Sequence, residues 1–221
     1  PYLSGFIHVG LDVGGGKRIR TEQEMMLNAT IQEKDQRGID LLMEHADSVR
    51  IVAQGVLGAV AEIPRTTQEL RECIPTLKRG EILVFSGLET GQSTDTGAIF
   101  SAQEFRRQCE YEAWIFMLSN VSYIFTADPN LQPDAKKIRR GNAKRLVQEN
   151  VLSDSPDAWV PGMHTVLDPR ATSLQVQNPV DMFYFTKITN FTDVTKVLRG
   201  IEPEEGTFLV PEEIETEYYP V

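Results

Sequence analysis

Asp12-Val13-Gly14-Gly15-Gly16-Lys17-Arg18-Ile19-Arg20 is the stretch of the 221-residue chain that indicates its class of fold. Its first two residues end Phe6–Val13, whose β-branched and aromatic residues are typical of a buried strand ending in a glycine turn. Glycines let backbone N–H groups approach an anion closely, and the first turn of a following helix adds partial positive charge. The spacing matches neither the Walker A loop nor the Rossmann fingerprint. Alone, the stretch therefore fits a phosphate site or a tight structural turn.

Strands and helices are predicted to alternate from this turn to the end of the chain. The other predicted strands are Val49–Ala53, Glu81–Phe85, Trp114–Leu118, Met182–Thr186 and Thr207–Val210. The predicted helices are a tract from Thr21 that Gly38 divides, with a capping-box pattern at Thr21 and Glu24, and Ile39–His45, Thr67–Leu77, Asp95–Gln108, Asn142–Asn150, Leu167–Gln177 and Thr192–Arg199. This alternation predicts an α/β fold, a three-layer αβα sandwich with a mainly parallel central sheet. Asp168 is expected to cap the helix Leu167–Gln177, with Pro169 at its first helical position. Trp114 is expected in the core, and the acidic tail Glu212–Val221 is expected to be poorly ordered or packed on a partner.

Ligands in such sheets bind beyond the carboxyl ends of the strands, so two further loops are of interest. Gly87–Asp95 is rich in glycines and hydroxyls and leads into a helix. Ser93, Thr94 and the backbone amides there could hold a phosphate, or Thr94 or Asp95 could simply cap the helix. Tyr123–Asn130 contains Thr126-Ala127-Asp128-Pro129, and an Asp-Pro pair by itself is a common turn.

Composition argues against several classes of function. The chain carries 32 acidic and 22 basic residues, a net charge of −10, which disfavours nucleic-acid binding. No apolar run approaches the roughly 20 residues that cross a bilayer, and we expect a soluble, intracellular protein of the cytoplasm. Its two cysteines and three histidines lack metal-ligand spacing, so we predict no metal site made of protein ligands.

In this order and at these spacings, the three loops resemble the amino-acid kinase superfamily, in particular its uridylate kinase branch. That family has a VGGGK-type loop, a TD segment opening a helix and a TADP segment, which are similar to Val13–Lys17, Thr94-Asp95 and Thr126–Pro129. The stretches Asn130–Ile138, Val166–Ala171 (VLDPRA, similar to the archaeal-type VIDPLA) and Gly206–Val210 also resemble it. The resemblance covers about residues 6–211.

The resemblance implies an ATP-dependent phosphotransferase whose acceptor is a nucleoside monophosphate, UMP in the first place, with Mg²⁺ as cofactor. The acceptor phosphate would meet residues of the first two loops, namely Gly14, Gly15, Gly16, Ser93, Thr94 and Asp95. ATP would lie against the third, namely Asn120, Phe125, Thr126, Asp128 and Pro129. It implies one domain over residues 1–221, with an acceptor-side part over about 1–110, an ATP-side part over about 111–211 and an acidic tail at 212–221. It also implies a homo- or hetero-oligomer, often a hexamer.

Two departures from the family pattern concern catalysis. Members normally begin with a strand ending in K-[IL]-G/S-G-[GS], whose lysine neutralises charge on the transferred group, and nothing before Val13 supplies it. Lys17 and Arg18 are therefore the candidate catalytic cations. The family's V-D-G-[VL]-[YF] reads Val121-Ser122-Tyr123-Ile124-Phe125 here, which puts a ring where close backbone approach is usual.

A related group is similar in other segments. Phe85–Gly87, Thr94–Gly97, Ala102–Phe105 and the basic run Lys17–Arg20 resemble segments of the molybdenum storage proteins. Those proteins use the same fold to bind ATP and house oxometalate clusters. The alternative function is thus a non-catalytic nucleotide-binding or oxometalate-storage subunit.

Overall fold

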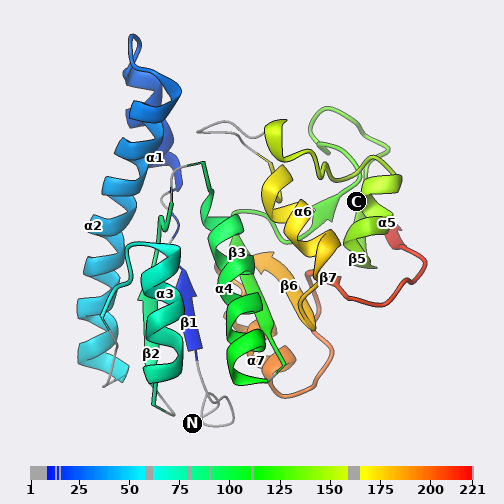
Figure 1. Cartoon of the computed structure of the whole chain (residues 1–221). Helices are drawn as coiled ribbons and strands as arrows, with labels where there is room; N and C mark the ends of the chain where they lie inside the picture. The colour runs from blue at the N-terminus through cyan, green and yellow to red at the C-terminus, as the bar shows by residue number, and fades with distance from the viewer. Residues whose placement is uncertain are drawn as a thin grey trace. The chain divides into compact units, whose positions relative to one another are not determined.

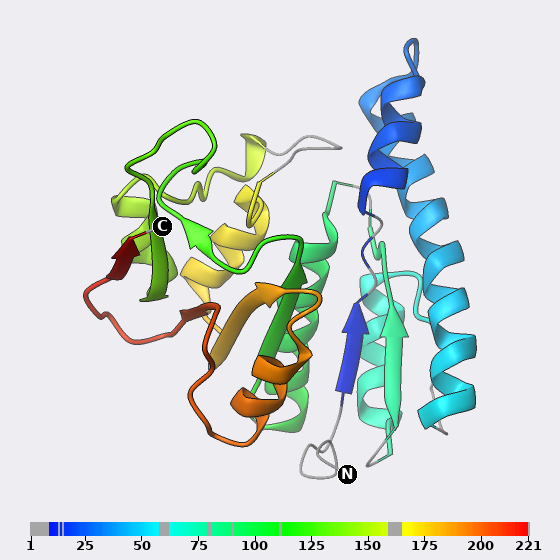
Figure 2. The ribbon, with the colours of Figure 1, turned by 180° about the vertical axis from the view of Figure 1, so that it is seen from behind.

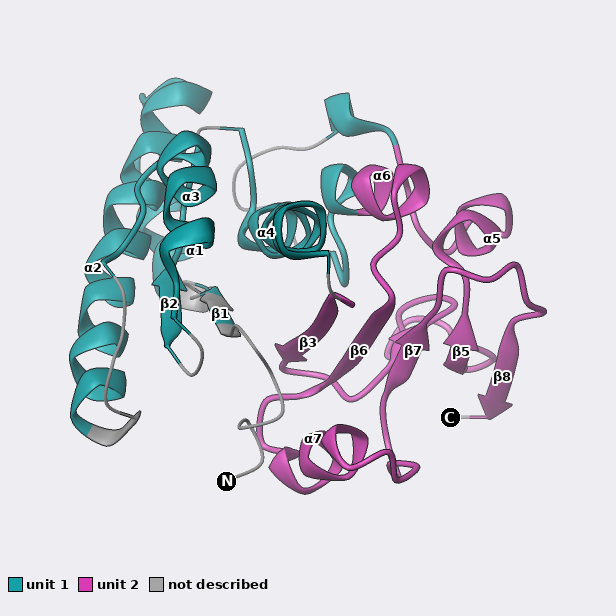
Figure 3. Ribbon diagram, turned by 60° about the horizontal axis from the view of Figure 1, so that its bottom comes forward, with its two compact units in different colours: residues 1, 3–111, 155–171 teal, residues 2, 112–154, 172–221 magenta. Residues whose placement is uncertain are grey.

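The computed structural model describes residues 9–12, 14, 16–57, 62–78, 81–89, 91–110, 112–158 and 165–220. Contacts divide the chain into two compact units, which are described separately (Figure 3). Unit 1 consists of residues 1, 3–111 and 155–171, and unit 2 of residues 2, 112–154 and 172–221. The predicted Phe6–His8 part of the first strand, and Val13 at its end, lie outside the described residues.

Unit 1 is a parallel strand pair between helices. Its elements are β1 (Val9–Asp12), α1 (Gly16–Met25), α2 (Ile31–Leu57), α3 (Thr67–Cys73) with a 3₁₀ turn at Ile74–Thr76, β2 (Ile82–Phe85), α4 (Thr94–Cys109) and a 3₁₀ turn at Pro156–Ala158. β1 pairs with β2 in parallel, with Asp12 opposite Phe85. In Figure 1 the long α2 runs beside this pair.

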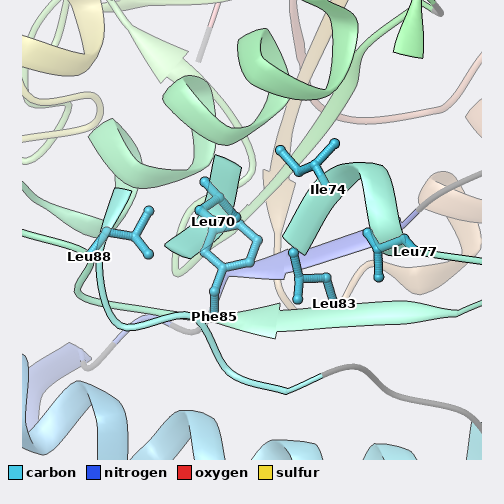
Figure 4. Packing of buried hydrophobic residues seen from close by; sticks show 6 residues of the cluster. All are labelled: Leu70, Ile74, Leu77, Leu83, Phe85 and Leu88. Carbon is cyan, nitrogen blue, oxygen red and sulfur yellow. The ribbon is translucent and has the colours of Figure 1, made fainter. Parts of the chain in front are cut away.

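Alternating residues of β2 face two helical layers, as a strand's period of two requires. Leu83 and Phe85 pack with α3 and its 3₁₀ turn in the cluster shown in Figure 4, which consists of Leu70, Ile74, Leu77, Leu83, Phe85 and Leu88. Ile82 and Val84 pack on the other face against Ala46 of α2. The predicted αβα layering is therefore present in unit 1.

The two helices near the N-terminus, α1 and α2, differ from the prediction in where they begin and end. α1 begins at Gly16, so Thr21 lies inside it and does not cap it. α2 runs unbroken from Ile31 to Leu57, so Gly38 does not divide the helical tract, and Val49–Ala53 is helix and not the predicted strand. The capping box lies instead at Thr30 and Glu33: Glu33 N–H donates to Thr30 Oγ1 at 3.2 Å, and Thr30 N–H donates to Glu33 Oε2 at 2.7 Å.

Unit 2 is a mixed sheet with helices on both faces. Its elements are β3 (Trp114–Ser119), β4 (Ile124–Phe125), β5 (Lys136–Gly141), α5 (Ala143–Gln148), α6 (Pro169–Gln177, of which residues 172–177 belong to this unit), β6 (Met182–Lys187), α7 (Phe191–Leu198), β7 (Thr207–Leu209) and β8 (Glu217–Pro220). The strand order is β3-β6-β7-β5-β4, with β8 paired to β5. β3–β6 and β5–β7 are parallel, whereas β6–β7, β4–β5 and β5–β8 are antiparallel.

The core of unit 2 lies against this sheet. Phe183, Tyr184 and Phe185 of β6 are fully buried. Tyr184 packs with Val197 of α7 and Phe208 of β7, and Figure 2 shows α7 in orange in front of the sheet. Figure 3 shows α5 and α6 on the opposite face. The α/β fold is thus confirmed, although the sheet of unit 2 is mixed because β4, β7 and β8 enter antiparallel pairs.

Two predictions about unit 2 are corrected. Trp114 was expected in the core, but 37% of its surface is exposed because it opens the edge strand β3. The acidic tail, expected to be loosely ordered or packed on a partner, ends in β8, which pairs with β5. Among the described residues, no helix combines the length and the apolarity that a membrane span needs; the 27-residue α2 carries many charges.

Candidate functional site

The first two glycine loops meet at one edge of the unit 1 sheet. Because β1 and β2 are parallel neighbours, their carboxyl ends open on the same side. A Cβ atom built on Gly14 would lie 3.7 Å from Thr94 Oγ1, and one built on Gly97 would lie 3.0 Å from Asp12 Oδ2. A Cβ at Gly97 would be unusually close to the Asp12 carboxylate, whereas one at Gly14 would make an ordinary contact with Thr94. The end of β1 and the loop after it thus lie against the start of α4.

Ser93 caps α4, whereas the sequence pattern favoured Thr94 or Asp95 as the cap. Ser93 has extended backbone (φ −82°, ψ 170°), and its hydroxyl accepts the Thr96 N–H at 3.0 Å. Thr94 is therefore the first helical residue, and its hydroxyl faces Gly14. The amide end of α4 and this hydroxyl lie where an anion would gain from the partial positive charge of the helix.

Asp168 joins the N-terminal ends of two helices. As the sequence predicted, it caps α6: its Oδ1 accepts the N–H groups of Arg170 at 2.8 Å and Ala171 at 3.1 Å. The same buried carboxylate accepts the hydroxyl of Ser93, and the Thr96 hydroxyl lies 3.2 Å from its Oδ2. One carboxylate thus fixes the start of α4 against the start of α6.

Asp95 lies close to this carboxylate, and its pKa is raised. Burial raises the pKa of Asp95, the negative charge of Asp168 raises it further, and a hydrogen bond from the Asp168 backbone N–H lowers it in part. The resulting pKa is about 7. Near neutral pH, Asp95 in the first turn of α4 therefore exchanges between a neutral and an ionised form.

Two charged residues near this loop were not singled out from the sequence. Asp35 of α2 accepts the backbone N–H of Gly91, and Arg170 of α6 donates to the backbone carbonyl of Gly91. Asp35 is buried, and burial raises its pKa while the Gly91 hydrogen bond and the charge of Arg170 oppose the rise. Neither residue lies in a glycine loop, so only contacts distant in sequence reveal them.

The structure describes only some of the remaining candidates of the first loop. Gly15 lies outside the described residues, Gly16 is the first residue of α1, and Lys17 is described only as part of that helix. Arg18 is exposed, and its Nη1 lies 3.3 Å from Nε2 of His45 on α2. The catalytic role of Lys17 and Arg18 stays a prediction.

The third loop, in unit 2, closes the β4–β5 hairpin. Thr126 is tied to Lys136 twice: Thr126 N–H donates to the Lys136 carbonyl at 3.0 Å, and Lys136 N–H donates to Thr126 Oγ1 at 2.9 Å. Asp128 Oδ1 accepts the Asn130 N–H at 2.8 Å, which forms a tight turn. Within unit 2, the Asp-Pro motif thus has a clear structural role in shaping the hairpin.

The other predicted ATP-side residues lie around this hairpin or at the end of β3. Phe125 is partly buried in β4, with its ring 6.3 Å from that of Tyr123 in an edge-to-face arrangement. Pro129 is partly buried in the turn, and Asn120 is exposed after β3, where its Oδ1 accepts the Ser119 hydroxyl at 3.2 Å. Their assignment to ATP stays a prediction.

The unit 1 loops fit a phosphate better than a bare metal ion. Gly14 and the Thr94 hydroxyl lie beside each other at the amide end of α4, and amide and hydroxyl donors suit an oxyanion. Within the described part of the chain, no group of three or more His, Cys, Asp or Glu residues could hold a metal ion. A Mg²⁺ ion that arrives with nucleotide phosphates needs few protein ligands, and that mode of binding is compatible with the site.

The fold and the paired glycine loops define the class of protein. The chain belongs to the amino acid kinase family, whose model matches residues 12–182. It is 27% identical over 207 residues to the uridylate kinase of Pyrococcus abyssi, covering 92% of this chain and 84% of that protein. It is 28% identical over 207 residues to the uridylate kinase of Halorubrum lacusprofundi, covering 92% and 78%.

Solved structures show the same fold. The uridylate kinase of Archaeoglobus fulgidus superposes with a TM-score of 0.68 at 21% identity, covering 94% of this chain and 87% of that one. The UMP kinase of Bacillus anthracis superposes with a TM-score of 0.71 at 15% identity, covering 96% and 98%.

Proposed function

We propose that this protein is a phosphotransferase of the nucleoside monophosphate kinase type, which transfers a phosphoryl group from ATP to UMP. The observation that carries the proposal is the meeting of the Gly14 loop with Thr94 at the start of α4, in a chain of the amino acid kinase family. The names of the Pyrococcus abyssi and Halorubrum lacusprofundi relatives support UMP as the acceptor.

Each group in unit 1 has a part in this proposal. The backbone amides at Gly14, Gly16 and the start of α4 bind the acceptor phosphate, and Thr94 Oγ1 orients it. Lys17 and Arg18 neutralise charge on the transferred group. Such a reaction depends chiefly on positioning and on stabilising charge as it develops, and Mg²⁺ bound with ATP supplies charge neutralisation at the phosphates.

In unit 2, we propose that ATP lies against the β3 end and the hairpin, at Asn120, Phe125, Thr126, Asp128 and Pro129. The hydrogen bonds that tie Thr126 to Lys136 and Asp128 to Asn130 give this hairpin a fixed backbone. A fixed backbone can present N–H and carbonyl groups to a nucleotide without an ordering cost at the moment of binding. We further propose that the protein works in the cytoplasm as an oligomer.

A steady-state assay of ADP release with ATP, Mg²⁺ and a panel of nucleoside monophosphates tests the proposal. We expect ADP release that depends on the acceptor and is fastest with UMP. Release that no monophosphate increases would contradict the phosphotransferase. Molybdenum or tungsten found by metal analysis of the purified protein would support the oxometalate-storage alternative instead.

A Thr94→Val variant localises the acceptor site in the same assay. It removes the hydroxyl next to Gly14 and keeps the β-branched shape, so we expect about a ten-fold rise in KM for UMP and little change in KM for ATP. Thr94→Ser, which keeps the hydroxyl, serves as the matched control.

A further inference from the structure

Gly91, in the loop between β2 and α4, is held on both sides by charged side chains. Its backbone N–H donates to Asp35 Oδ2 and its carbonyl accepts from Arg170 Nη1. Asp35 comes from α2 and Arg170 from the start of α6, and all three residues belong to unit 1. Hydrogen bonds to charged groups are stronger than those between neutral groups, so this loop is tied to two helices.

Gly91 is shaped for this contact. Its φ of +75° is left-handed, a region that favours glycine, and a Cβ atom there would lie 2.9 Å from Arg170 Nη1. The guanidinium therefore packs directly on the backbone of Gly91. A side chain at position 91 would strain the turn and displace the arginine.

Asp168, two residues before Arg170, contacts the same loop at Ser93. Arg170 Nε donates to the Pro156 carbonyl at 3.3 Å, and its backbone N–H donates to Asp168. Asp168 in turn accepts the Ser93 hydroxyl. The loop is therefore hydrogen-bonded to Arg170 at Gly91 and to Asp168 at Ser93, the residue immediately before Thr94.

Arg170 is also where this chain departs from the stretch that it resembles. Val166–Ala171 reads VLDPRA, whereas the similar archaeal-type stretch reads VIDPLA, with leucine at the place of Arg170. Leucine has no hydrogen-bond donor and cannot bind the Gly91 carbonyl. Leucine at position 170 would therefore remove the hydrogen bond from α6 to the Gly91 carbonyl.

We propose that Arg170, opposed by Asp35, is a positioning residue that holds the Gly91–Thr94 loop in the conformation that binds the acceptor phosphate. A loop that is already ordered binds its ligand without the cost of ordering, so the arginine raises affinity for the acceptor without touching it. The acceptor part of this inference rests on the proposed function, whereas the restraint of the loop does not.

Hydrogen exchange on the full-length protein without nucleotide tests the restraint. We expect the amides of residues 87–96 to exchange about ten-fold faster in Arg170→Leu than in wild type, with Arg170→Lys in between because it keeps one donor. Arg107→Leu, which removes an exposed arginine of α4 that pairs with Glu104, is the matched control and should leave this segment unchanged. Unchanged exchange in a folded Arg170→Leu protein, with normal protection in β3 and β6, overturns the proposal.

Steady-state kinetics with UMP tests the consequence for the acceptor. In Arg170→Leu we expect about a ten-fold rise in KM for UMP, with kcat lowered less than about three-fold. A variant that merely folds poorly would lose kcat in proportion to the active fraction and keep its KM. Faster exchange together with an unchanged KM therefore also overturns the positioning role. If the wild-type protein transfers no phosphate, the proposed function fails, and hydrogen exchange alone then decides whether Arg170 restrains the loop.

Discussion

At the scale of single residues, Asp95 makes stability depend on pH in an unusual direction. Its folded-state pKa of about 7 lies above the ordinary value of 3.8, so the folded protein binds this proton more tightly than the unfolded chain does. The stabilisation is complete below about pH 4 and is lost as the pH rises through 7. We predict that the side chain of Asp95→Asn, which is neutral at every pH, raises the free energy of unfolding at pH 8 by on the order of 2 kcal/mol relative to wild type, measured by urea denaturation.

The pH dependence of the same comparison provides its control. At pH 5 the two proteins should differ much less, because Asp95 is already protonated in the folded wild type. Parallel pH profiles for the two proteins would mean that Asp95 is an ordinary ionised carboxylate.

Asp193 of α7 shows the opposite shift. Burial alone would raise its pKa, but hydrogen bonds from the N–H groups of Glu204 and Glu205, from Asn190 and from Lys196 lower it to about 2. Its stabilisation is therefore present above about pH 4 and is lost as the pH falls toward 2. We predict that Asp193→Asn lowers the free energy of unfolding by about 2–3 kcal/mol at pH 7, measured by urea denaturation, and by much less at pH 2.5. An equal loss at both pH values would show that packing, and not the charge, accounts for the effect.

A local pattern predicted the cap of α6, but no local pattern predicted the charged residues that contact distant parts of unit 1. Asp168 before Pro169 was predicted as an N-cap and is one. Asp35 lies in the second turn of a long helix and Arg170 in the first turn of another, where exposed charges are common, so neither has a local signal. Only their shared partner, Gly91, distinguishes them, and that contact depends on the folded chain.

At the scale of elements, α2 depends on its N-terminal capping box. The Thr30 hydroxyl accepts the Glu33 N–H, and Glu33 accepts the Thr30 N–H in return. We predict that Thr30→Ala lowers the free energy of unfolding by about 1 kcal/mol in urea denaturation and speeds hydrogen exchange in the first turn of α2. Thr30→Ser keeps the acceptor and should behave as wild type. A stable Thr30→Ala protein with unchanged exchange would mean that packing alone fixes this end of the helix.

The sequence predicted most elements correctly, and α2 shows why one region failed. Val49–Ala53 has the β-branched residues of a strand, but Ala46, Val49 and Ala53 are spaced as on one helical face, and Ala46 and Val49 pack against β2. Gly38 was taken as a break, yet it is buried where α1 approaches: a Cβ there would lie 2.6 Å from Gln23 Nε2. Glycine occurs both at close contacts and at chain breaks. Its role at position 38 could therefore be assigned only once the packing of α1 on α2 was known.

At the scale of the whole molecule, unit 1 is not continuous in sequence. Residues 155–171 return to it after the chain has entered unit 2 at residue 112. This returning segment supplies Asp168 to Ser93 and Arg170 to Gly91. The acceptor-side part that we propose for residues 1–110 is therefore complete only when a later stretch of the chain is present.

We predict from this arrangement that a fragment of residues 1–111 does not hold the β2–α4 loop in its native state. Without residues 155–171, the Ser93 hydroxyl and the Gly91 carbonyl lose their charged partners, so only the Asp35–Gly91 hydrogen bond and the apolar contacts of α4 with β2 remain to order the loop. Hydrogen exchange of residues 87–96 in the fragment should approach that of an unfolded chain, and its thermal transition should be broad. The control is a second fragment in which a flexible linker joins residues 155–171 to residue 111. It should regain part of the protection of residues 87–96. Native-like protection of residues 87–96 in the short fragment would show that the returning segment does not maintain the loop.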